Sequence, residues 1–233
     1  MDHGMMVRKR LVVHTERMSG QLSHVFLLSP AYCGGRRALA LLRPGSSSAL
    51  AQRLRAGTLT LGEAFSFMSG LYFRGKLAYA QAFARVNHLG ESAAFVITPT
   101  RGLQVPETPV SVDLLHEFAS TDISAGDPQY RVPLERDVIA LAARLSPAGR
   151  VVLLGSIATG KYADVLAPAL GGRLHYPASF VGRGDMSRGG LLLRSASSGV
   201  ELEYQPLEPD SNRRGPRPPR LEPLVQSRRA GRA

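Results

Sequence analysis

Residues 155–162 have the types and the spacing of a phosphate-binding loop. An apolar stretch leads into Gly155, and four residues separate it from Gly160 and Lys161. Seven of the eight positions fit the pattern G-x-x-x-x-G-K-[ST], in which backbone N–H groups and a lysine hold phosphate. Tyr162 occupies the eighth position, where the pattern has a hydroxyl for magnesium. The loop therefore predicts an anion contact without a magnesium ligand.

Three interpretations of this loop stay open. A nucleoside triphosphatase is disfavoured by Tyr162, by the lack of glycine at 156–159 and by the lack of a later strand ending in aspartate. Another kind of anion or nucleotide site would use Gly155, Ser156 and Lys161, with the N-terminus of the following helix facing the ligand. An ordinary strand-to-helix turn would give the same pattern with no ligand.

The segment 180–190 is a second concentration of reactive residue types. It contains four glycines together with Arg183, Asp185 and Arg188. Glycines let a backbone approach a ligand, arginines bind phosphate or carboxylate with two donors, and Asp185 would act as a catalytic general base or as an anchor for a cation. We expect a loop that folds over the first one, so that Lys161 and the arginines share an anion. The alternative is a flexible hairpin-like loop in which Asp185 pairs with Arg183 or Arg188.

Lysine is almost absent from the chain, which has 26 arginines against three lysines. Both internal lysines, Lys76 and Lys161, follow a glycine. Because lysine and arginine differ in geometry and hydration, a lysine retained beside glycine indicates a specific contact, and Lys76 is a candidate ligand-binding residue. Tyr32 and Tyr72 are the aromatic side chains that we expect to stack on a base.

Other reactive residue types give weaker signals. Cys33 follows a strand but has no histidine nearby in sequence to activate it, so we expect a structural cysteine. A single cysteine excludes an intramolecular disulfide and a multi-cysteine zinc site. The six histidines lack metal-ligand spacing, so no metal site is predicted. The sequence also lacks the G-x-S-x-G motif of many serine hydrolases, which disfavours a serine hydrolase.

A sheet and its helices must position these residues. Continuous apolar runs predict buried strands at 24–29, 93–98 and 151–155, with a further short strand at 173–176. Helices are expected at 36–42, 48–55, 61–68, 73–86, 111–119, 134–145 and 160–170. Segments 190–194 and 200–205 have strand character and would form a hairpin.

Buried strands separated by long helical segments predict an α/β fold, namely a three-layer α/β/α sandwich with a mostly parallel central sheet. Ligands bind such sheets outside the carboxyl ends of the strands. The loops at 29–36, 98–103 and 155–162 would therefore share one rim. Arg101 and Gly102, in the second of these loops, are predicted to contact the ligand.

Composition divides the chain of 233 residues into three parts. We expect a poorly ordered lead-in at 1–21, a single α/β domain at 22–207 and a disordered basic Pro/Arg-rich tail at 208–233. The net charge is +11, and residues 211–233 contribute seven arginines against one glutamate. Such a tail attracts polyanions or is simply solvated. No apolar run is long enough for a membrane helix or a signal-peptide core, so we expect a cytoplasmic protein with no membrane partner.

Three short segments are similar to a family of poorly characterised domains related to the uracil-DNA-glycosylase-like domain of archaeosine synthase. Residues 27–33, Leu-Leu-Ser-Pro-Ala-Tyr-Cys, resemble the family's first strand and turn. Residues 96–106, which include Gly-Leu-x-x-Pro, resemble its second strand, and residues 153–162 resemble a later strand and helix start. The resemblance implies an α/β/α sandwich in the setting of deazaguanine or nucleic-acid modification. The chain departs from the family in having no run of acidic residues in the first turn.

These observations predict a nucleobase- or nucleotide-binding protein, whose partner would be a nucleotide, a nucleobase or a nucleic acid. An enzyme of nucleic-acid or deazaguanine modification is one form of this hypothesis, and its cofactor is unknown. The first alternative is a non-catalytic nucleic-acid-binding module that uses the basic C-terminal tail. A metal-dependent phosphotransferase is the second, and Tyr162 disfavours it. The oligomeric state is left open.

Overall fold

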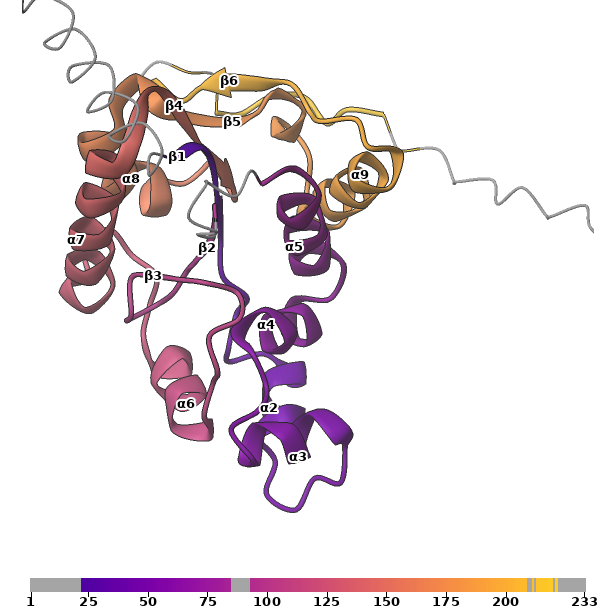
Figure 1. Cartoon of the computed structure of the whole chain (residues 1–233). Helices are drawn as coiled ribbons and strands as arrows, with labels where there is room; N and C mark the ends of the chain where they lie inside the picture. Colours follow the sequence, from indigo (N-terminus) through magenta and orange to yellow (C-terminus); the bar gives the residue numbers. More distant parts are fainter. Residues whose placement is uncertain (1–21, 85–92, 209–210, 212, 220, 222–233) are drawn as a thin grey trace, which may run out of the picture.

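A six-stranded, mostly parallel sheet forms the centre of the molecule (Figure 1). The computed structural model describes residues 22–84, 93–208, 211, 213–219 and 221. Along the chain, the strands are β1 (Leu22–Leu28), β2 (Ala94–Ile97), β3 (Leu103–Gln104), β4 (Leu145–Leu154), β5 (Leu174–Pro177) and β6 (Tyr204–Pro206). Their order in the sheet is β3-β2-β1-β4-β5-β6. β1 pairs in parallel with β2 and β4, and β4 with β5, whereas β3 and β6 are antiparallel edge strands.

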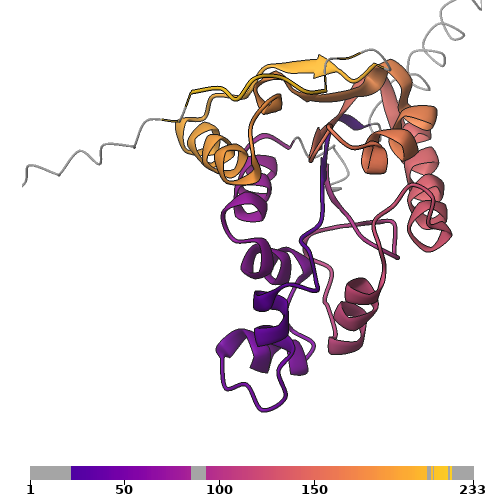
Figure 2. The same cartoon turned by 180° about the vertical axis from the view of Figure 1, so that it is seen from behind.

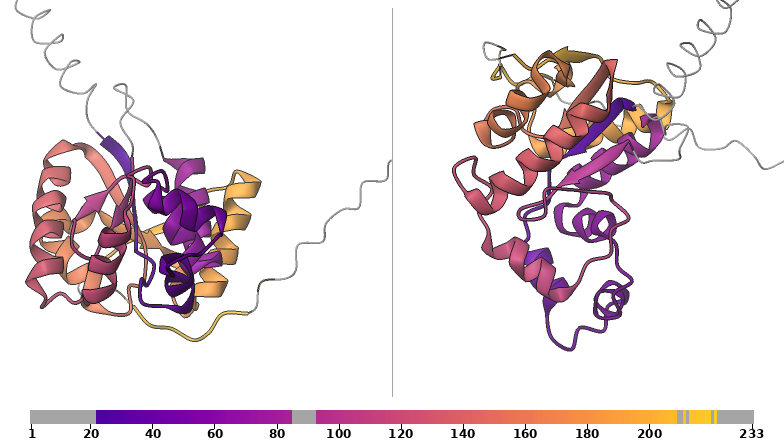
Figure 3. Two further views of the ribbon diagram at one scale, coloured as in Figure 1. Left: turned by 90° about the horizontal axis from the view of Figure 1, so that it is seen from below. Right: turned by 60° about the vertical axis from the view of Figure 1, so that its left-hand side comes forward.

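Helices cover both faces of this sheet, so the expected α/β/α sandwich is confirmed (Figures 1 and 2). The helices are α2 (Arg36–Leu42), α3 (Ala49–Arg55), α4 (Leu61–Ser69), α5 (Leu71–Phe83), α6 (Val112–Ser120), α7 (Pro128–Arg144), α8 (Gly160–Leu170) and α9 (Asp185–Ser198). The view from below places α7 and α8 on one side of the sheet and α5 and α9 on the other (Figure 3). α2, α3, α4 and α6 lie beyond the carboxyl ends of β1 and β2 (Figure 1).

The central strands are apolar on both faces because each face is covered by helices. On β1, Phe26 and Leu28 belong to the hydrophobic core under α5 and α9, whereas Val25 and Leu27 belong to the core under α7 and α8. β4 alternates between the two cores in the same way. Burial on both faces explains why these strands appear in the sequence as continuous apolar runs. The predicted parallel neighbours at 24–29, 93–98 and 151–155 are confirmed.

The helices expected from the sequence are present, and α7 is longer than predicted. It begins at Pro128 rather than at 134. An Asp127 carboxylate oxygen accepts a hydrogen bond from the backbone N–H of Gln129 at 2.8 Å, and proline fits the first turn of a helix. Pro133 lies inside the helix, although proline is unfavourable there and in a sequence marks a boundary. The favourable start of the helix outweighs this interruption.

The prediction of a hairpin between 190–194 and 200–205 is wrong. Residues 190–194 belong to α9, and β6 pairs instead with β5. The glycine-rich loop expected at 180–190 is also shorter than predicted, because α9 already begins at Asp185. The apolar run in this segment belongs to a helix whose glycines face a neighbouring helix.

Two glycines let α5 and α9 approach each other closely. A Cβ atom added at Gly75 would lie 2.6 Å from the Gly189 carbonyl oxygen, and one added at Gly189 would lie 2.7 Å from the Leu71 carbonyl oxygen. Since real Cβ atoms do not approach backbone atoms this closely, glycine is required at both positions. For Gly189, the sequence had suggested a loop glycine instead.

Part of the basic C-terminal segment lies against the folded domain. An Arg213 guanidinium nitrogen is 3.8 Å from an Asp164 carboxylate oxygen on α8. A Cβ atom at Gly182 would lie 2.1 Å from the Pro216 carbonyl oxygen, so this turn and the C-terminal segment are in direct contact. The lead-in at 1–21 falls outside the described residues. Within the described part of the chain, no helix is both long and apolar enough to cross a membrane.

Candidate functional site

A cleft opens where the strand connections diverge on the two sides of the sheet. From β1 the chain continues to β2, and from β4 it continues to β5 on the opposite side, so the carboxyl ends of β1 and β4 form a topological switch point. The cleft has a volume of about 530 Å³. It is lined by residues from the loops after β1, β2 and β4 and from α2, α4, α5, α6, α8 and α9. We call it the switch-point cleft, and its polar lining includes Ser29, Tyr32, Arg36, Arg37, Tyr72, Asp122, Ser156, Lys161 and Asp185.

The loop after β4 presents unpaired backbone donors at this cleft. In the described part of the chain, the backbone N–H groups of residues 156–161 donate no hydrogen bond to another residue. Thr159, which precedes α8, provides no side-chain cap for the helix. A helix N-terminus with free N–H groups attracts anions, and Lys161 adds a positive charge in its first turn. Ser156 and Lys161 both line the cleft, as the sequence predicted for neighbouring ligand contacts.

Tyr162 is part of the hydrophobic core and also lines the cleft. Only 3% of it is exposed, and it packs in the core beneath α8. Burial raises its pKa, so the hydroxyl stays protonated. The Tyr130 hydroxyl donates a hydrogen bond of 2.9 Å to the Lys161 carbonyl oxygen and fixes this turn from below. The departure from the magnesium-binding pattern therefore has a packing reason.

Lys76, a predicted ligand contact, lies behind the lining of the switch-point cleft, next to the lining residues Ser29 and Tyr72. It is 1% exposed, and its Nζ donates a hydrogen bond of 2.8 Å to Ser29 Oγ and another to the Ser29 carbonyl oxygen. The same nitrogen lies 4.4 Å from the centre of the Tyr72 ring and 4.9 Å from that of Phe73. Burial lowers the pKa of Lys76 from 10.5 to about 7, although Asp185 opposes this effect.

The two tyrosines predicted to stack on a base differ in exposure. Tyr32 is 76% exposed at the edge of the cleft and can meet a planar ligand. Tyr72 is buried, and its hydroxyl forms no hydrogen bond with any described residue. Burial raises the pKa of Tyr72, and the nearby Arg188 partly offsets the rise. Tyr72 therefore presents no exposed stacking face, and its protonated hydroxyl is itself buried.

Asp185 and Arg188 are neighbours on the first turns of α9. Asp185 lines the cleft with a side chain that is 70% exposed. Arg188 is buried, and its guanidinium donates two hydrogen bonds, of 3.1 and 3.3 Å, to the Phe180 carbonyl oxygen. One of its nitrogens is 3.7 Å from Asp185, which corresponds to the alternative pairing considered for this segment. Arg188 thus positions the start of α9 and does not line the cleft.

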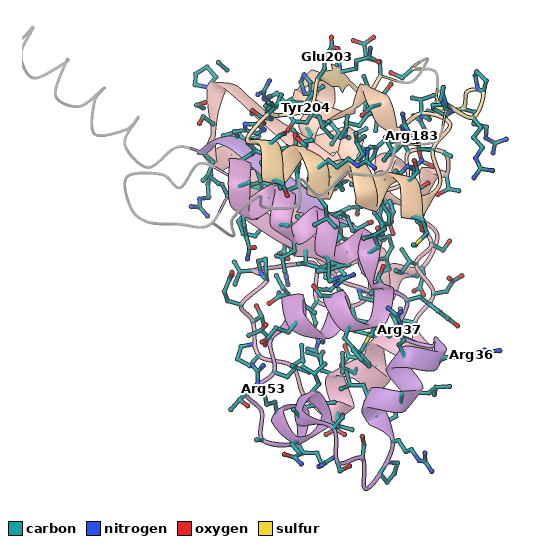
Figure 4. The ribbon with its side chains drawn as sticks, turned by 90° about the vertical axis from the view of Figure 1, so that its right-hand side faces the viewer. Arg36, Arg37, Arg53, Arg183, Glu203 and Tyr204 are labelled. Carbon is teal, nitrogen blue, oxygen red and sulfur yellow. The ribbon has the colours of Figure 1, made fainter. Side chains whose placement is uncertain are left out.

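Six of the predicted ligand contacts lie outside the lining, namely Lys76, Arg101, Gly102, Gly155, Arg183 and Arg188. Arg183 donates to the Ser179 carbonyl oxygen and to Ser187 Oγ, and it lies at the end of α9, away from Arg36 and Arg37 (Figure 4). Arg101 forms a two-point ion pair with Glu117, with contacts of 2.9 and 2.6 Å. Gly102 lies against Asp137, on the α7 side of the sheet.

Gly155 is beneath the cleft rather than at its surface. A Cβ atom at this position would lie 3.0 Å from the Cβ of Ser29, since the two residues follow the paired ends of β4 and β1. A larger residue would push against Ser29. Gly155 therefore controls the distance between the two central loops.

Cys33 lines the cleft without the properties of a nucleophile. Burial raises the pKa of its thiol to about 12, and Sγ donates a weak hydrogen bond to the Ala31 carbonyl oxygen. The thiolate is the reactive form, so the thiol is inert near neutral pH. Among the described residues, no cluster of histidine, cysteine, aspartate and glutamate could hold a metal ion.

Four polar residues line the cleft without having been predicted as ligand contacts, namely Ser29, Arg36, Arg37 and Asp122. A signal existed for Ser29, because it follows a buried strand directly. Tyr72 and Lys76 are four residues apart on one helix, a spacing that places two side chains on one face. No family model, no curated protein and no solved structure matched this chain. The geometry of the switch-point cleft therefore carries the functional argument.

Proposed function

We propose that the protein binds a nucleotide, or a nucleobase joined to a phosphate, in the switch-point cleft. One observation carries this proposal. The uncapped N-terminus of α8, with the charge of Lys161, faces the same cleft as the exposed ring of Tyr32. An anion and a flat ring are the two parts of a nucleotide that such groups recognise.

Different groups around the cleft would bind the two parts of the ligand, the phosphate and the base. Lys161 and the free N–H groups of 156–161 would hold the phosphate through charge-assisted hydrogen bonds. Arg37 lies near this region and donates a hydrogen bond of 3.3 Å to the Phe67 carbonyl oxygen, whereas Arg36 extends away from the ribbon (Figure 4). The carboxylates of Asp122 and Asp185 would accept hydrogen bonds from the amino groups of a base.

The size of the cleft suits a single nucleotide. Small-ligand sites have volumes of roughly 300–1,000 Å³. The 530 Å³ available here falls in that range. A base in a polymer would reach the cleft only if it were unstacked from its neighbours. A free nucleotide and a flipped-out residue of a nucleic acid are therefore both compatible with the proposal.

Calorimetric titration of the four nucleoside monophosphates and their nucleosides tests the proposal. We expect the monophosphate to bind more tightly than its nucleoside, and Lys161→Ala to remove most of this difference. Hydrogen bonds to charged groups are worth about 1.5–3 kcal/mol, so the affinity should fall by roughly one to two powers of ten. Arg136→Ala is the matched control, because Arg136 is an exposed cation of α7 paired with Asp137. Equal affinity of nucleoside and monophosphate for the unmodified protein would contradict the proposal.

A further inference from the structure

Ser29 combines a position in the cleft with a close basic partner. It is the first residue after β1 and lies at the floor of the switch-point cleft, 4% exposed. Its Oγ is 2.8 Å from Lys76 Nζ, within the range for proton transfer between a nucleophile and its base. Tyr162 also lies beside Ser29, since burial raises the pKa of Tyr162 and a hydrogen bond with Ser29 partly offsets the rise. A buried serine thus faces both a ligand cavity and an amine.

Lys76 has no counter-ion at hydrogen-bonding distance. Among the described residues, no carboxylate forms an ion pair with its Nζ. An unpaired ammonium is costly inside a protein, so a fully buried lysine favours the neutral amine. A neutral amine has a lone pair and accepts a proton. The 2.8 Å contact with Ser29 Oγ then works in the reverse direction, with the hydroxyl donating to Nζ.

We propose that Ser29 is the nucleophile and Lys76 the general base of an acyl-transfer site that cleaves an ester or amide bound in the switch-point cleft. A serine activated by lysine is a known variant of the nucleophile–base pair and needs neither histidine nor a nucleophile-elbow motif. The inference uses the same cleft as the proposed nucleotide site, but it does not depend on the identity of the ligand.

The reaction conserves atoms and charge. Ser29 Oγ attacks the carbonyl carbon while its proton moves to the neutral Nζ of Lys76. The C–O or C–N bond to the leaving group then breaks, and the leaving alcohol or amine takes the proton from Nζ. Water attacks the acyl-serine ester with Lys76 again accepting the proton. The acid is released, and the proton returns to Ser29 Oγ.

The loop after β4 supplies donors for the negative charge that develops on the carbonyl oxygen. Gly155 lies directly against Ser29, and the unpaired N–H groups of 156–161 begin with the next residue. Backbone N–H groups that are fixed before the reaction stabilise such an oxyanion effectively. The Lys161 side chain lines the same wall of the cleft and adds positive charge.

The ionisation of Lys76 suits this role. Its pKa is lowered to about 7, mainly by burial, with Asp185 opposing the change and Lys161 and Arg188 adding to it. Tyr72, on the same helix, and Tyr162, on α8, also adjoin the pair, and burial keeps both protonated. A general base works best when its pKa is near the ambient pH.

A purely structural lysine is the competing explanation. In that case Nζ would only satisfy the Ser29 carbonyl oxygen at the end of β1, and the contact with Oγ would be incidental. The two explanations differ in the reactivity of Ser29. A structural lysine leaves the hydroxyl as inert as any other serine, whereas a general base activates it.

Labelling of the full-length protein with a fluorophosphonate, located by peptide mass mapping, tests the proposal. We expect one adduct on Ser29, formed at a rate that rises with pH through an inflection at about pH 7. Ser29→Ala should abolish the adduct, and Lys76→Gln should slow labelling by about 10²-fold or more. Ser120→Ala, at an exposed end of α6, should label like the unmodified protein.

An absence of Ser29 labelling in the folded, unmodified protein would overturn the proposal, and so would an adduct on another serine. Equal labelling of a folded Lys76→Gln variant would remove the role of the lysine. If this variant does not fold, the unmodified protein decides, because a rate independent of pH between about pH 6 and pH 8 contradicts a base of this kind. Nucleotide affinity measured on the same sample separates this inference from the proposed function, since either can fail alone.

Discussion

Lys76 is a fully buried ionisable residue. Its protonation therefore makes the free energy of unfolding depend on pH. Its pKa is about 7 in the folded protein, against a usual value of 10.5. Between these values, the unfolded chain binds a proton that the folded chain does not. Stability must then rise with pH, because the unfolded state is the one that loses protons. Below about pH 7 both states bind the proton, and the full free-energy cost of burying a charged lysine lowers the stability.

We predict that the free energy of unfolding increases between pH 7 and pH 9, by at most about 1.4 kcal/mol per pH unit. The window closes near pH 9, because the Cys33 thiol, whose pKa is raised from 9.0 to about 12, acts in the opposite direction above it. Urea unfolding at several pH values measures this slope. Lys76→Met should remove it, whereas Lys161→Met should keep it. A flat profile for the unmodified protein would contradict a neutral Lys76.

The importance of single residues was only partly predictable from the sequence. The scarcity of lysine pointed to Lys76 and Lys161; Lys161 lines the switch-point cleft, and Lys76 is buried behind its lining residue Ser29. Arg101 and Arg183 are cations that could equally have bound a ligand. Their guanidinium groups instead donate hydrogen bonds to Glu117 and to Ser187 Oγ. Local sequence does not reveal which cation has a partner distant in the chain.

At the scale of elements, the closest helix contact in the fold depends on Gly75 and Gly189. Replacing Gly75 by alanine would bring Cβ to 2.6 Å from the Gly189 carbonyl oxygen, so α5 and α9 would have to separate. Overpacking of this kind costs about 1–3 kcal/mol. We predict that Gly75→Ala lowers the free energy of unfolding by that amount and shifts the start of α9, where Asp185 lies.

Gly190→Ala is the matched control for this contact. Gly190 is in α9, next to Gly189, but an added Cβ atom would be 3.5 Å from the nearest side-chain atom, an ordinary contact. Since alanine favours helix more than glycine by roughly 1 kcal/mol, this variant should be as stable as the parent or more so. Urea unfolding of both variants measures their free energies of unfolding relative to the parent. Similar stability of Gly75→Ala and Gly190→Ala would show that the helices can separate freely.

The buried strands could be predicted from the sequence, whereas the glycine-containing helix α9 could not. β1, β2 and β4 are buried on both faces, so their composition alone identified them. α9 was misread, because its glycines resemble a loop and its leucines resemble a strand. Its helical state depends on packing against α5 (Figure 3). The local sequence of 185–198 does not contain this contact. Tertiary contact, rather than local propensity, decided this segment.

At the scale of the whole molecule, the basic C-terminal segment and the cleft make separate predictions. Deleting residues 211–233 removes seven arginines and the Arg213–Asp164 contact, but it leaves the buried Leu207 in place. We predict that nucleoside monophosphates still bind, with affinity within about threefold of the parent, a change of less than 1 kcal/mol. Affinity for single-stranded nucleic acid and its dependence on salt should both fall, because fewer phosphates are neutralised.

A chain that ends at Leu221 separates packing from charge, since it keeps the segment 213–219 against the domain. Fluorescence titration of both truncated chains at two salt concentrations measures the difference. Loss of all nucleotide binding on deletion of 211–233 would favour the alternative function, a nucleic-acid-binding module that acts through its tail. Retained binding would place the ligand in the domain.

The convergence of loops after β1, β2 and β4 was predictable, since parallel strands place their carboxyl ends at one rim. The exact members of the cleft were not predictable. Asp122 and Arg37 come from segments whose positions depend on how α2, α4 and α6 pack beyond the sheet. Such packing is a property of the whole fold.

A crystal structure with the tightest-binding nucleoside monophosphate tests the central claim most directly. We predict the phosphate at the N-terminus of α8, within about 3 Å of backbone N–H groups of 156–161 and of Lys161 Nζ. The base should lie against Tyr32, on the side of the cleft that carries Asp122 or Asp185. A nucleotide bound outside the switch-point cleft, or one whose phosphate points away from α8, would contradict the account.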